Sequence, residues 1–155
     1  MKSIDQWLSE YGESHQNPTN KMVHFVCVPV IFFTVVGLLY CIKLPFNFAE
    51  GYPVTVAHIV TLMVAIYYCF LSIPLAIGMT LYAILCLLLC HVIQQATGGN
   101  LLWVSIGLFV LAWIAQFWGH KVEGRKPSFL KDLQYLMIGP AWIMSFLFKK
   151  IGLSV

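Results

Sequence analysis

The sequence predicts an all-α membrane protein: a polytopic membrane helix bundle of four spans in one domain, residues 1–155. Hydrophobic residues make up 60% of the chain and charged residues only 10%, whereas about 25% of a typical soluble domain is charged. The mean hydropathy of +0.83 points the same way. A length of 155 residues suits a single domain. This much apolar surface excludes a water-soluble fold, because one small core could not cover it.

The chain opens with an N-terminal segment, residues 1–22, that we expect to lie at the membrane interface. Ser3 and Gln6 have the spacing of a capping box at the start of a helix over 3–11. The apolar residues of this helix recur at helical spacing: Ile4, Trp7, Leu8 and Tyr11. Such a helix would lie flat, with its aromatic rings at headgroup level. Asn17 and Pro18 then predict the N-cap and first position of the next helix.

Four uncharged apolar segments follow within residues 23–118. A helix of about 20 residues rises about 30 Å, enough to cross the hydrocarbon core. The predicted spans are 23–42, 54–72, 75–93 and 101–118. They are joined by a loop at 43–53 that contains proline and glycine, a tight connection at 73–74, and a glycine-rich turn at 94–100.

A polar segment, 119–132, separates the four spans from a C-terminal apolar helix in 133–155. The apolar run 133–148 is short for a span, and Gly139-Pro140 is expected to interrupt it. It is therefore a broken fifth span, a re-entrant helix or an interfacial helix, and we favour the last two.

An even number of spans places both ends of the four-span unit on one side of the membrane. The residues expected on that side are His15, Asn20, His24, His120 and Glu123, with His58 and His91 on the other. Lysine and arginine are concentrated around the first group, and the positive-inside rule places that side in the cytoplasm. We expect a bacterial inner membrane, since no retrieval signal is evident, with the endoplasmic reticulum as the alternative.

The segment 116–127 combines a histidine, a carboxylate and several basic residues within a short stretch. On a helix, Gln116, His120 and Glu123 share one face, and Gly119 leaves room for another helix to approach. Imidazole and carboxylate groups together suit Fe(II), Zn or Mn, and so few histidines indicate a single ion. The same pattern is also compatible with a helix-end cap.

Two further groups of residues are candidates for supporting roles in such a site. Asn20 and Gln116 are candidates to orient metal ligands from a second layer. Arg125 and Lys126 are candidates to bind the carboxylate of a lipid-like substrate, or else anchor phospholipid headgroups. We expect the membrane and a lipid-like substrate as partners, and no nucleic acid.

Two signatures in the chain resemble those of a small membrane family. The first is Tyr11-x3-His15-x4-Asn20-x3-His24-x4-Pro29. The second is Trp113-x2-Gln116-Phe117-x-Gly119-His120-x2-Glu123-Gly124-Arg125-x-Pro127. The family is typified by the fungal endoplasmic-reticulum 2-hydroxy fatty acid dioxygenase, and the similarity covers nearly the whole chain. Cys27 departs from the pattern, where glycine is common.

The resemblance implies an enzyme of fatty acid α-oxidation. It would use one Fe(II) per chain and O2, without 2-oxoglutarate, to convert a long-chain 2-hydroxy fatty acid to the acid one carbon shorter. By this resemblance His15, His24 and His120 match the family's histidines, with Glu123 as carboxylate partner and Tyr11 in the second layer. A zinc-dependent lipid hydrolase and a non-enzymatic lipid-binding or scaffold protein are the alternatives.

Overall fold

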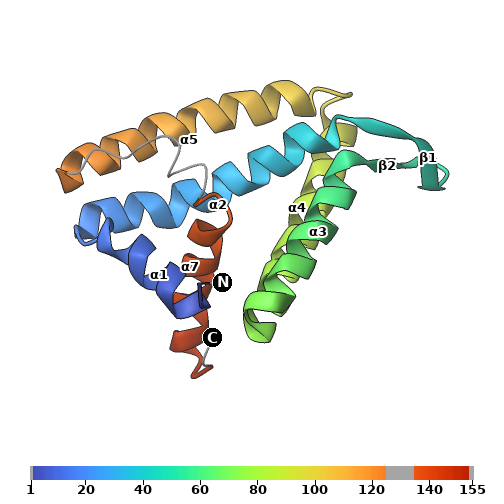
Figure 1. Cartoon of the computed structure of the whole chain (residues 1–155). Helices are drawn as coiled ribbons and strands as arrows, with labels where there is room; N and C mark the ends of the chain where they lie inside the picture. Colours follow the sequence, from blue (N-terminus) through green and yellow to red (C-terminus); the bar gives the residue numbers. More distant parts are fainter. Residues whose placement is uncertain (1, 125–134, 154–155) are drawn as a thin grey trace.

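The computed structural model describes residues 2–124 and 135–153 of the chain (Figure 1). Its elements are α1 (Ile4–Glu13), α2 (Pro18–Tyr40), β1 (Lys43–Ala49), β2 (Tyr52–Thr55), α3 (Val56–Leu71), α4 (Ile73–Ala96), α5 (Leu101–Glu123) and α7 (Ile138–Lys150). Helices thus dominate the described residues, and the predicted all-α membrane class is confirmed.

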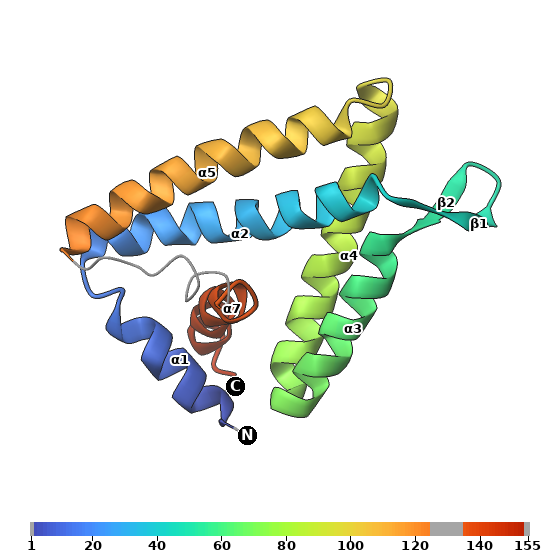
Figure 2. The same ribbon diagram turned by 45° about the horizontal axis from the view of Figure 1, so that its top comes forward.

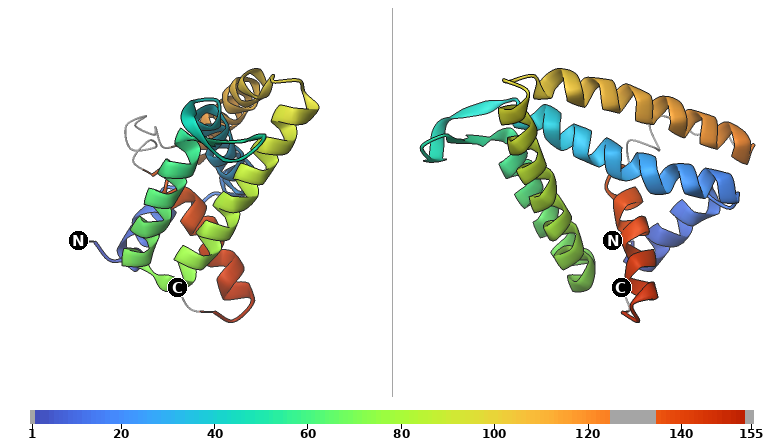
Figure 3. Two further views of the ribbon diagram at one scale, coloured as in Figure 1. Left: turned by 90° about the vertical axis from the view of Figure 1, so that its right-hand side faces the viewer. Right: turned by 180° about the vertical axis from the view of Figure 1, so that it is seen from behind.

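The long helices are arranged as two antiparallel pairs. α2 packs along α5, and α3 packs along α4. Figure 2 shows the two pairs meeting at one end, near the β-hairpin, and diverging from there. α7 contacts α1, α2 and α4 and so lies between the diverging pairs (Figure 3). The arrangement places the start of α2 beside the end of α5, far from the hairpin end.

A close contact at Gly37 holds the meeting point together. A Cβ atom at this position would clash with Ser105 Oγ on α5 and would lie 3.7 Å from Cys90 Sγ on α4. The absence of a side chain at Gly37 therefore lets three helices approach one another where the two pairs join.

Three helices in the described residues are long and apolar enough to cross a membrane: α2, α4 and α5. α3 is apolar but has only 16 residues, which gives a length of about 24 Å at 1.5 Å per residue. The predicted second span, 54–72, is shortened because the chain up to Thr55 belongs to β2. The number of four spans therefore stays a prediction, and three of the described helices have the length that a span needs.

The expected loop at 43–53 is instead a β-hairpin, and this prediction was wrong. β1 and β2 pair antiparallel, with Gly51 in the connecting turn at a φ of 79°. Proline and glycine suggested a loop, but a two-stranded ribbon has only edge strands, and these tolerate proline. The hairpin exposes three large aromatic side chains, those of Phe46, Phe48 and Tyr52.

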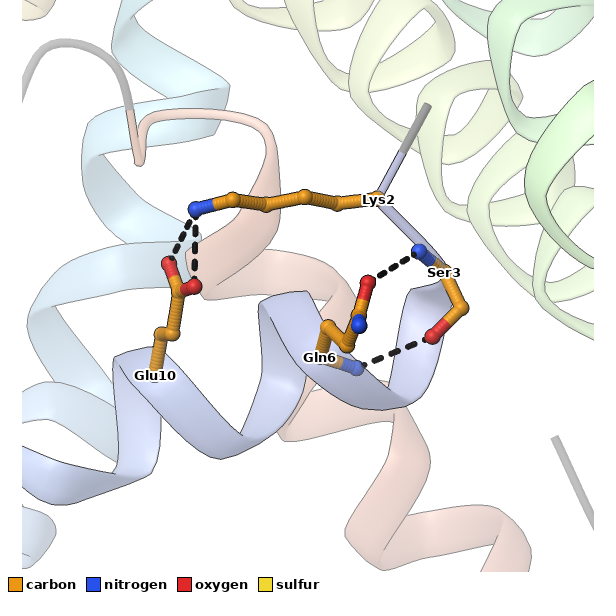
Figure 4. Close-up of polar contacts among 4 residues, drawn as sticks. All are labelled: Lys2, Ser3, Gln6 and Glu10. Atoms are coloured by element: carbon orange, nitrogen blue, oxygen red, sulfur yellow. Dashed lines mark hydrogen bonds and ion pairs between the residues drawn. The ribbon is translucent and has the colours of Figure 1, made fainter.

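The start of α1 forms as the capping pattern predicts (Figure 4). Gln6 N donates to Ser3 Oγ at 3.3 Å, and Ser3 N donates to Gln6 Oε1 at 2.9 Å. Lys2 and Glu10 form an exposed ion pair beside this cap, with an N–O distance of 2.7 Å. The start of the helix is thus closed by local hydrogen bonds.

The apolar stripe of α1 does not behave as expected. Ile4 and Tyr11 are buried within the protein, with exposed fractions of 8% and 4%. Tyr11 packs against Val28 of α2 and Trp142 of α7. The Tyr11 ring is therefore covered by protein, because α7 supplies a surface for the stripe, and its expected place at headgroup level stays a prediction.

Both helices that carry the candidate site extend beyond their predicted spans. α2 starts at Pro18, where Asn17 Oδ1 accepts a hydrogen bond from Thr19 N at 2.9 Å, as the sequence predicts. α5 continues to Glu123, five residues past the predicted end of the fourth span. The first part of the predicted polar segment is thus helical.

α7 has 13 residues, about 20 Å of helix, which is too short to cross a bilayer. We had expected Gly139 and Pro140 to interrupt this helix, but they lie in its first turn. Proline is tolerated there because the first N–H groups of a helix have no intrahelical partner.

Candidate metal centre

Three histidines meet where the start of α2 faces the end of α5. His24 comes from α2, His120 from α5, and His15 from the connector between α1 and α2. One ligand atom of each lies within 4.8 Å of the others. All three side chains are buried, with exposed fractions of 2%, 0% and 4% for His15, His24 and His120. The convergence expected from the sequence is therefore present in the fold.

The ring of His24 is oriented by its own helix. His24 Nδ1 lies 3.0 Å from the carbonyl oxygen of Asn20, and a carbonyl can only accept, so Nδ1 carries the hydrogen. This leaves a lone pair on Nε2, which points at His120 Nε2 at a distance of 3.2 Å. A histidine whose other nitrogen donates to a backbone carbonyl has the usual arrangement of a metal ligand.

The ring of His15 is held by the end of α1. His15 Nδ1 donates to the Tyr11 carbonyl oxygen at 2.6 Å, an oxygen of the last helical turn, where carbonyls lack a helical partner. The ring also stacks on the Tyr11 ring, with centroids 4.2 Å apart. In the described part of the chain, no hydrogen-bond partner reaches the buried His15 Nε2. An unpaired buried acceptor is costly, so this atom points to a ligand outside the chain.

Burial also sets the charge of His15. It lowers the pKa of the imidazole below its ordinary value, and this outweighs the opposite effects of the Tyr11 carbonyl and the Glu123 carboxylate. The ring is therefore neutral at pH 7, the form in which histidine binds metals.

The donor atoms have the chemistry that a metal ion needs, and the spacing of one pair of them can be compared with metal geometry. Metal–nitrogen bonds to histidine are about 2.0–2.1 Å long. Two such nitrogens are then about 3.0 Å apart at a right angle and about 3.4 Å apart at a tetrahedral angle. The 3.2 Å between the Nε2 atoms of His24 and His120 lies within this range. The imidazole donors are of the kind that Fe(II) and Zn(II) bind, and the His24–His120 pair has a compatible spacing.

The Glu123 carboxylate accepts hydrogen bonds from two backbone amides and from the Asn20 side chain. Its carboxylate accepts hydrogen bonds from Gln16 N at 2.9 Å and from Asn17 N at 2.9 and 3.2 Å. Asn20 Nδ2 donates to the same carboxylate at 3.0 Å. The end of α5 is thereby tied to the connector that carries His15 and to the start of α2. A negative charge at a helix N-terminus is also favoured by the helix dipole.

Comparison with known proteins places this chain in a family. The family model for "2-hydroxy-palmitic acid dioxygenase Mpo1-like" matches residues 1–151. The chain is 32% identical over 147 residues to the 2-hydroxy-palmitic acid dioxygenase MPO1 of Saccharomyces cerevisiae, covering 92% of this chain and 78% of the yeast protein. The chain belongs to the Mpo1-like family. No solved structure matches this Mpo1-like protein.

Other predicted site residues of the Mpo1-like protein lie beside the histidines. Asn20 is fully buried and links the His24 ring, through its carbonyl, to the Glu123 carboxylate, through its side chain. Gln116 is 7% exposed and lies one turn of α5 before His120. The predicted substrate contacts Arg125 and Lys126 lie outside the described residues.

Sequence reasoning missed the aromatic wall of the Mpo1-like site. The Trp142 ring of α7 lies 5.6 Å from the His15 ring and 5.3 Å from the Tyr11 ring. Tyr135 makes an edge contact with the Tyr11 ring at 5.3 Å. The signal available in the sequence was the pair Gly139-Pro140, which starts the helix that brings Trp142 to this position.

Proposed function

We propose that this protein is a metal-dependent dioxygenase that converts long-chain 2-hydroxy fatty acids to acids one carbon shorter. The observation that carries the proposal is the convergence of three buried histidines, with an unpartnered Nε2 on His15, in a member of the Mpo1-like family. The relative in yeast is named for 2-hydroxy-palmitic acid, which suggests a related substrate here.

The overall reaction balances without a second organic substrate. One 2-hydroxy acid and one O2 give the shortened acid, carbon dioxide and water. Oxidation of the hydroxyl carbon to a carboxyl and release of the former carboxyl carbon remove four electrons, which reduction of O2 consumes. We therefore propose that no 2-oxoglutarate is required.

His15, His24 and His120 are the residues that would hold one Fe(II). Bound there, the ion would supply Lewis acidity and redox chemistry for O2. The backbone carbonyls of Tyr11 and Asn20 keep two of the rings turned toward the site. Glu123 holds the His15 connector against α5 through the Gln16 and Asn17 amides. We propose this positioning role for Glu123 in place of the direct ligand expected from the sequence.

The surroundings suit a substrate with a polar head and an apolar chain. The site lies at the ends of two long apolar helices, α2 and α5, whose outer faces expose large hydrophobic side chains. We propose that the carboxylate reaches Arg125 and Lys126 and that the acyl chain stays among apolar residues. We also propose that this end faces the cytoplasm, since Lys21 and Lys121 lie near it.

The deciding experiment is metal analysis of anaerobically purified full-length protein, followed by 2-hydroxyhexadecanoic acid and O2. We expect about one iron per chain, O2 uptake and formation of pentadecanoic acid. One zinc per chain without O2 uptake would instead support the lipid hydrolase. No bound metal under any loading condition would support a lipid-binding or scaffold protein.

A further inference from the structure

A small cavity lies about one helical turn from the three histidines, toward the middle of α2 and α5. Val28, four residues after His24 on α2, and Gln116, four residues before His120 on α5, both line it. Because α2 and α5 run antiparallel, these two steps lead in the same direction, away from the helix ends. Tyr11, whose ring stacks on His15, forms another wall. The cavity is thus one helical turn from the histidines.

The cavity wall carries the buried amide oxygen of Gln116. Gln116 is 7% exposed, and no described residue forms a hydrogen bond with its buried Oε1 atom. Val28 and Ile31 line the same space with apolar groups. A buried carbonyl oxygen left unpaired is unfavourable, so this position calls for a hydrogen-bond donor from outside the chain.

The size of the cavity limits what that donor can be. Its volume is about 20 Å³, and about 10–15 Å³ on this measure accommodates one water molecule. A fatty acid carboxylate is acceptor-only when ionised and would lie unfavourably beside Val28 and Ile31. A single hydroxyl group or a water molecule fits both the size and the chemistry.

We propose that Gln116 Oε1 accepts a hydrogen bond from the 2-hydroxyl group of the substrate, which occupies this cavity. The inference rests on the proposed function and assigns its selectivity for 2-hydroxy acids to one side chain. An acid without the hydroxyl would leave Gln116 unpaired in the complex. Sites built to bind a hydroxyl reject analogues that lack it much more strongly than apolar pockets reject an extra group.

The test compares binding of 2-hydroxyhexadecanoic and hexadecanoic acids to the full-length protein under anaerobic conditions, where no turnover occurs. We expect the wild type to bind the hydroxy acid about 10- to 100-fold more tightly, the range expected for an unpaired buried acceptor. Gln116→Met, which keeps the size and removes the acceptor, should lower this preference to about threefold or less. Gln116→Glu, which keeps an acceptor, should retain it.

Gln94→Met is the matched control. Gln94 also has a buried, unpartnered Oε1 among the described residues, but it lies on α4 near the hairpin end. This variant should keep the wild-type preference. Loss of the preference in Gln94→Met as well would overturn a specific role for Gln116.

The outcomes separate the inference from the function. A wild type with equal affinity for both acids overturns the proposed substrate class and the inference with it. A preference that survives in Gln116→Met overturns the inference alone and assigns the cavity to a structural water. A second test uses only the wild-type protein and so does not depend on the folding of a variant. In it, 2-methoxyhexadecanoic acid, which lacks the O–H donor, should bind no better than hexadecanoic acid. Binding equal to that of the hydroxy acid would contradict the proposal.

Discussion

His24 Nε2 and His120 Nε2 lie 3.2 Å apart, although 96 residues separate them along the chain. The contact exists because α2 and α5 pack against each other along their length. The geometry of the candidate metal centre is therefore a property of helix packing. Changes that separate α2 from α5 should alter the site without touching a histidine.

Gly119→Ala should weaken metal binding about tenfold or more. The added Cβ would lie 2.7 Å from Asn20 Oδ1 and 3.2 Å from Val23 Cγ1, so the buried Asn20 side chain or the spacing of α2 and α5 must shift beside His24 and His120. Such a displacement changes the spacing of the donor nitrogens, to which affinity is sensitive. Titration with Co(II), followed by its visible absorption, measures the effect.

Gly107→Ala is the control for that substitution. Gly107 is on the same helix, and nothing lies within 4 Å of the position of its added Cβ. Alanine should leave metal affinity unchanged and stabilise the helix by up to about 1 kcal/mol. Equal losses in both variants would show that helix substitution as such, and not the approach of α2, causes the defect.

Replacing His15, His24 or His120 singly with alanine should abolish stoichiometric metal binding and catalysis. Each offers one of the three clustered ligand atoms. His91→Ala should retain the metal, because His91 lies at the hairpin end, stacked on Tyr52 and in hydrogen-bond contact with Tyr40 Oη. Elemental analysis of the purified variants gives the result, and full metal content in a His120→Ala protein would exclude this site.

Glu123→Ala should weaken metal binding about 10- to 100-fold without abolishing it, as is typical for residues that support metal ligands. The substitution leaves the Gln16 and Asn17 amides without their carboxylate and loosens the connector that carries His15. Hydrogen exchange at residues 14–20 should rise in parallel. Complete loss of the metal with unchanged exchange would instead identify Glu123 as a direct ligand.

Glu10→Ala serves as the comparison for Glu123. The Glu10 carboxylate pairs with Lys2 in an exposed position on α1. Exposed pairs contribute about 0–1 kcal/mol, so metal affinity and exchange at 14–20 should remain at wild-type values.

Tyr68→Phe should lower the free energy of unfolding by about 1–2 kcal/mol. Tyr68 is fully buried on α3, and its hydroxyl donates to the Met137 carbonyl oxygen just before α7. This bond joins the second helix pair to the helix that supports the site. Denaturant unfolding in detergent measures the change. The neighbouring, partly exposed Tyr67 provides a Tyr→Phe variant that should be nearly neutral.

The sequence predicts the helices because they depend on local patterns, whereas the shared side of the histidines was inferred from the even number of predicted spans. Apolar run lengths mark α2, α4 and α5, and Asn17-Pro18 marks the start of α2. The helical spacing of Gln116, His120 and Glu123 places them on one face of α5. These signals are local and survive any arrangement of the helices.

The features that the sequence does not predict depend on contacts that no particular residue type marks. The donors to Glu123 are backbone amides of Gln16 and Asn17, which every non-proline residue offers. The burial of Tyr11 depends on α7, whose position follows from tertiary packing. The hairpin was missed because Pro45 and Pro53 also suit loops, and pairing between strands leaves little trace in a short segment.

The unequal lengths of the paired helices α3 and α4 have a consequence for the surrounding lipid. α3 has 16 residues and α4 has 24, about 24 and 36 Å of helix. A hydrocarbon core about 30 Å thick is too thick for the first and too thin for the second. Hydrophobic mismatch of this kind is relieved by tilting the long helix and thinning the bilayer beside the short one. Lipids with shorter acyl chains are therefore expected to gather at the α3 face.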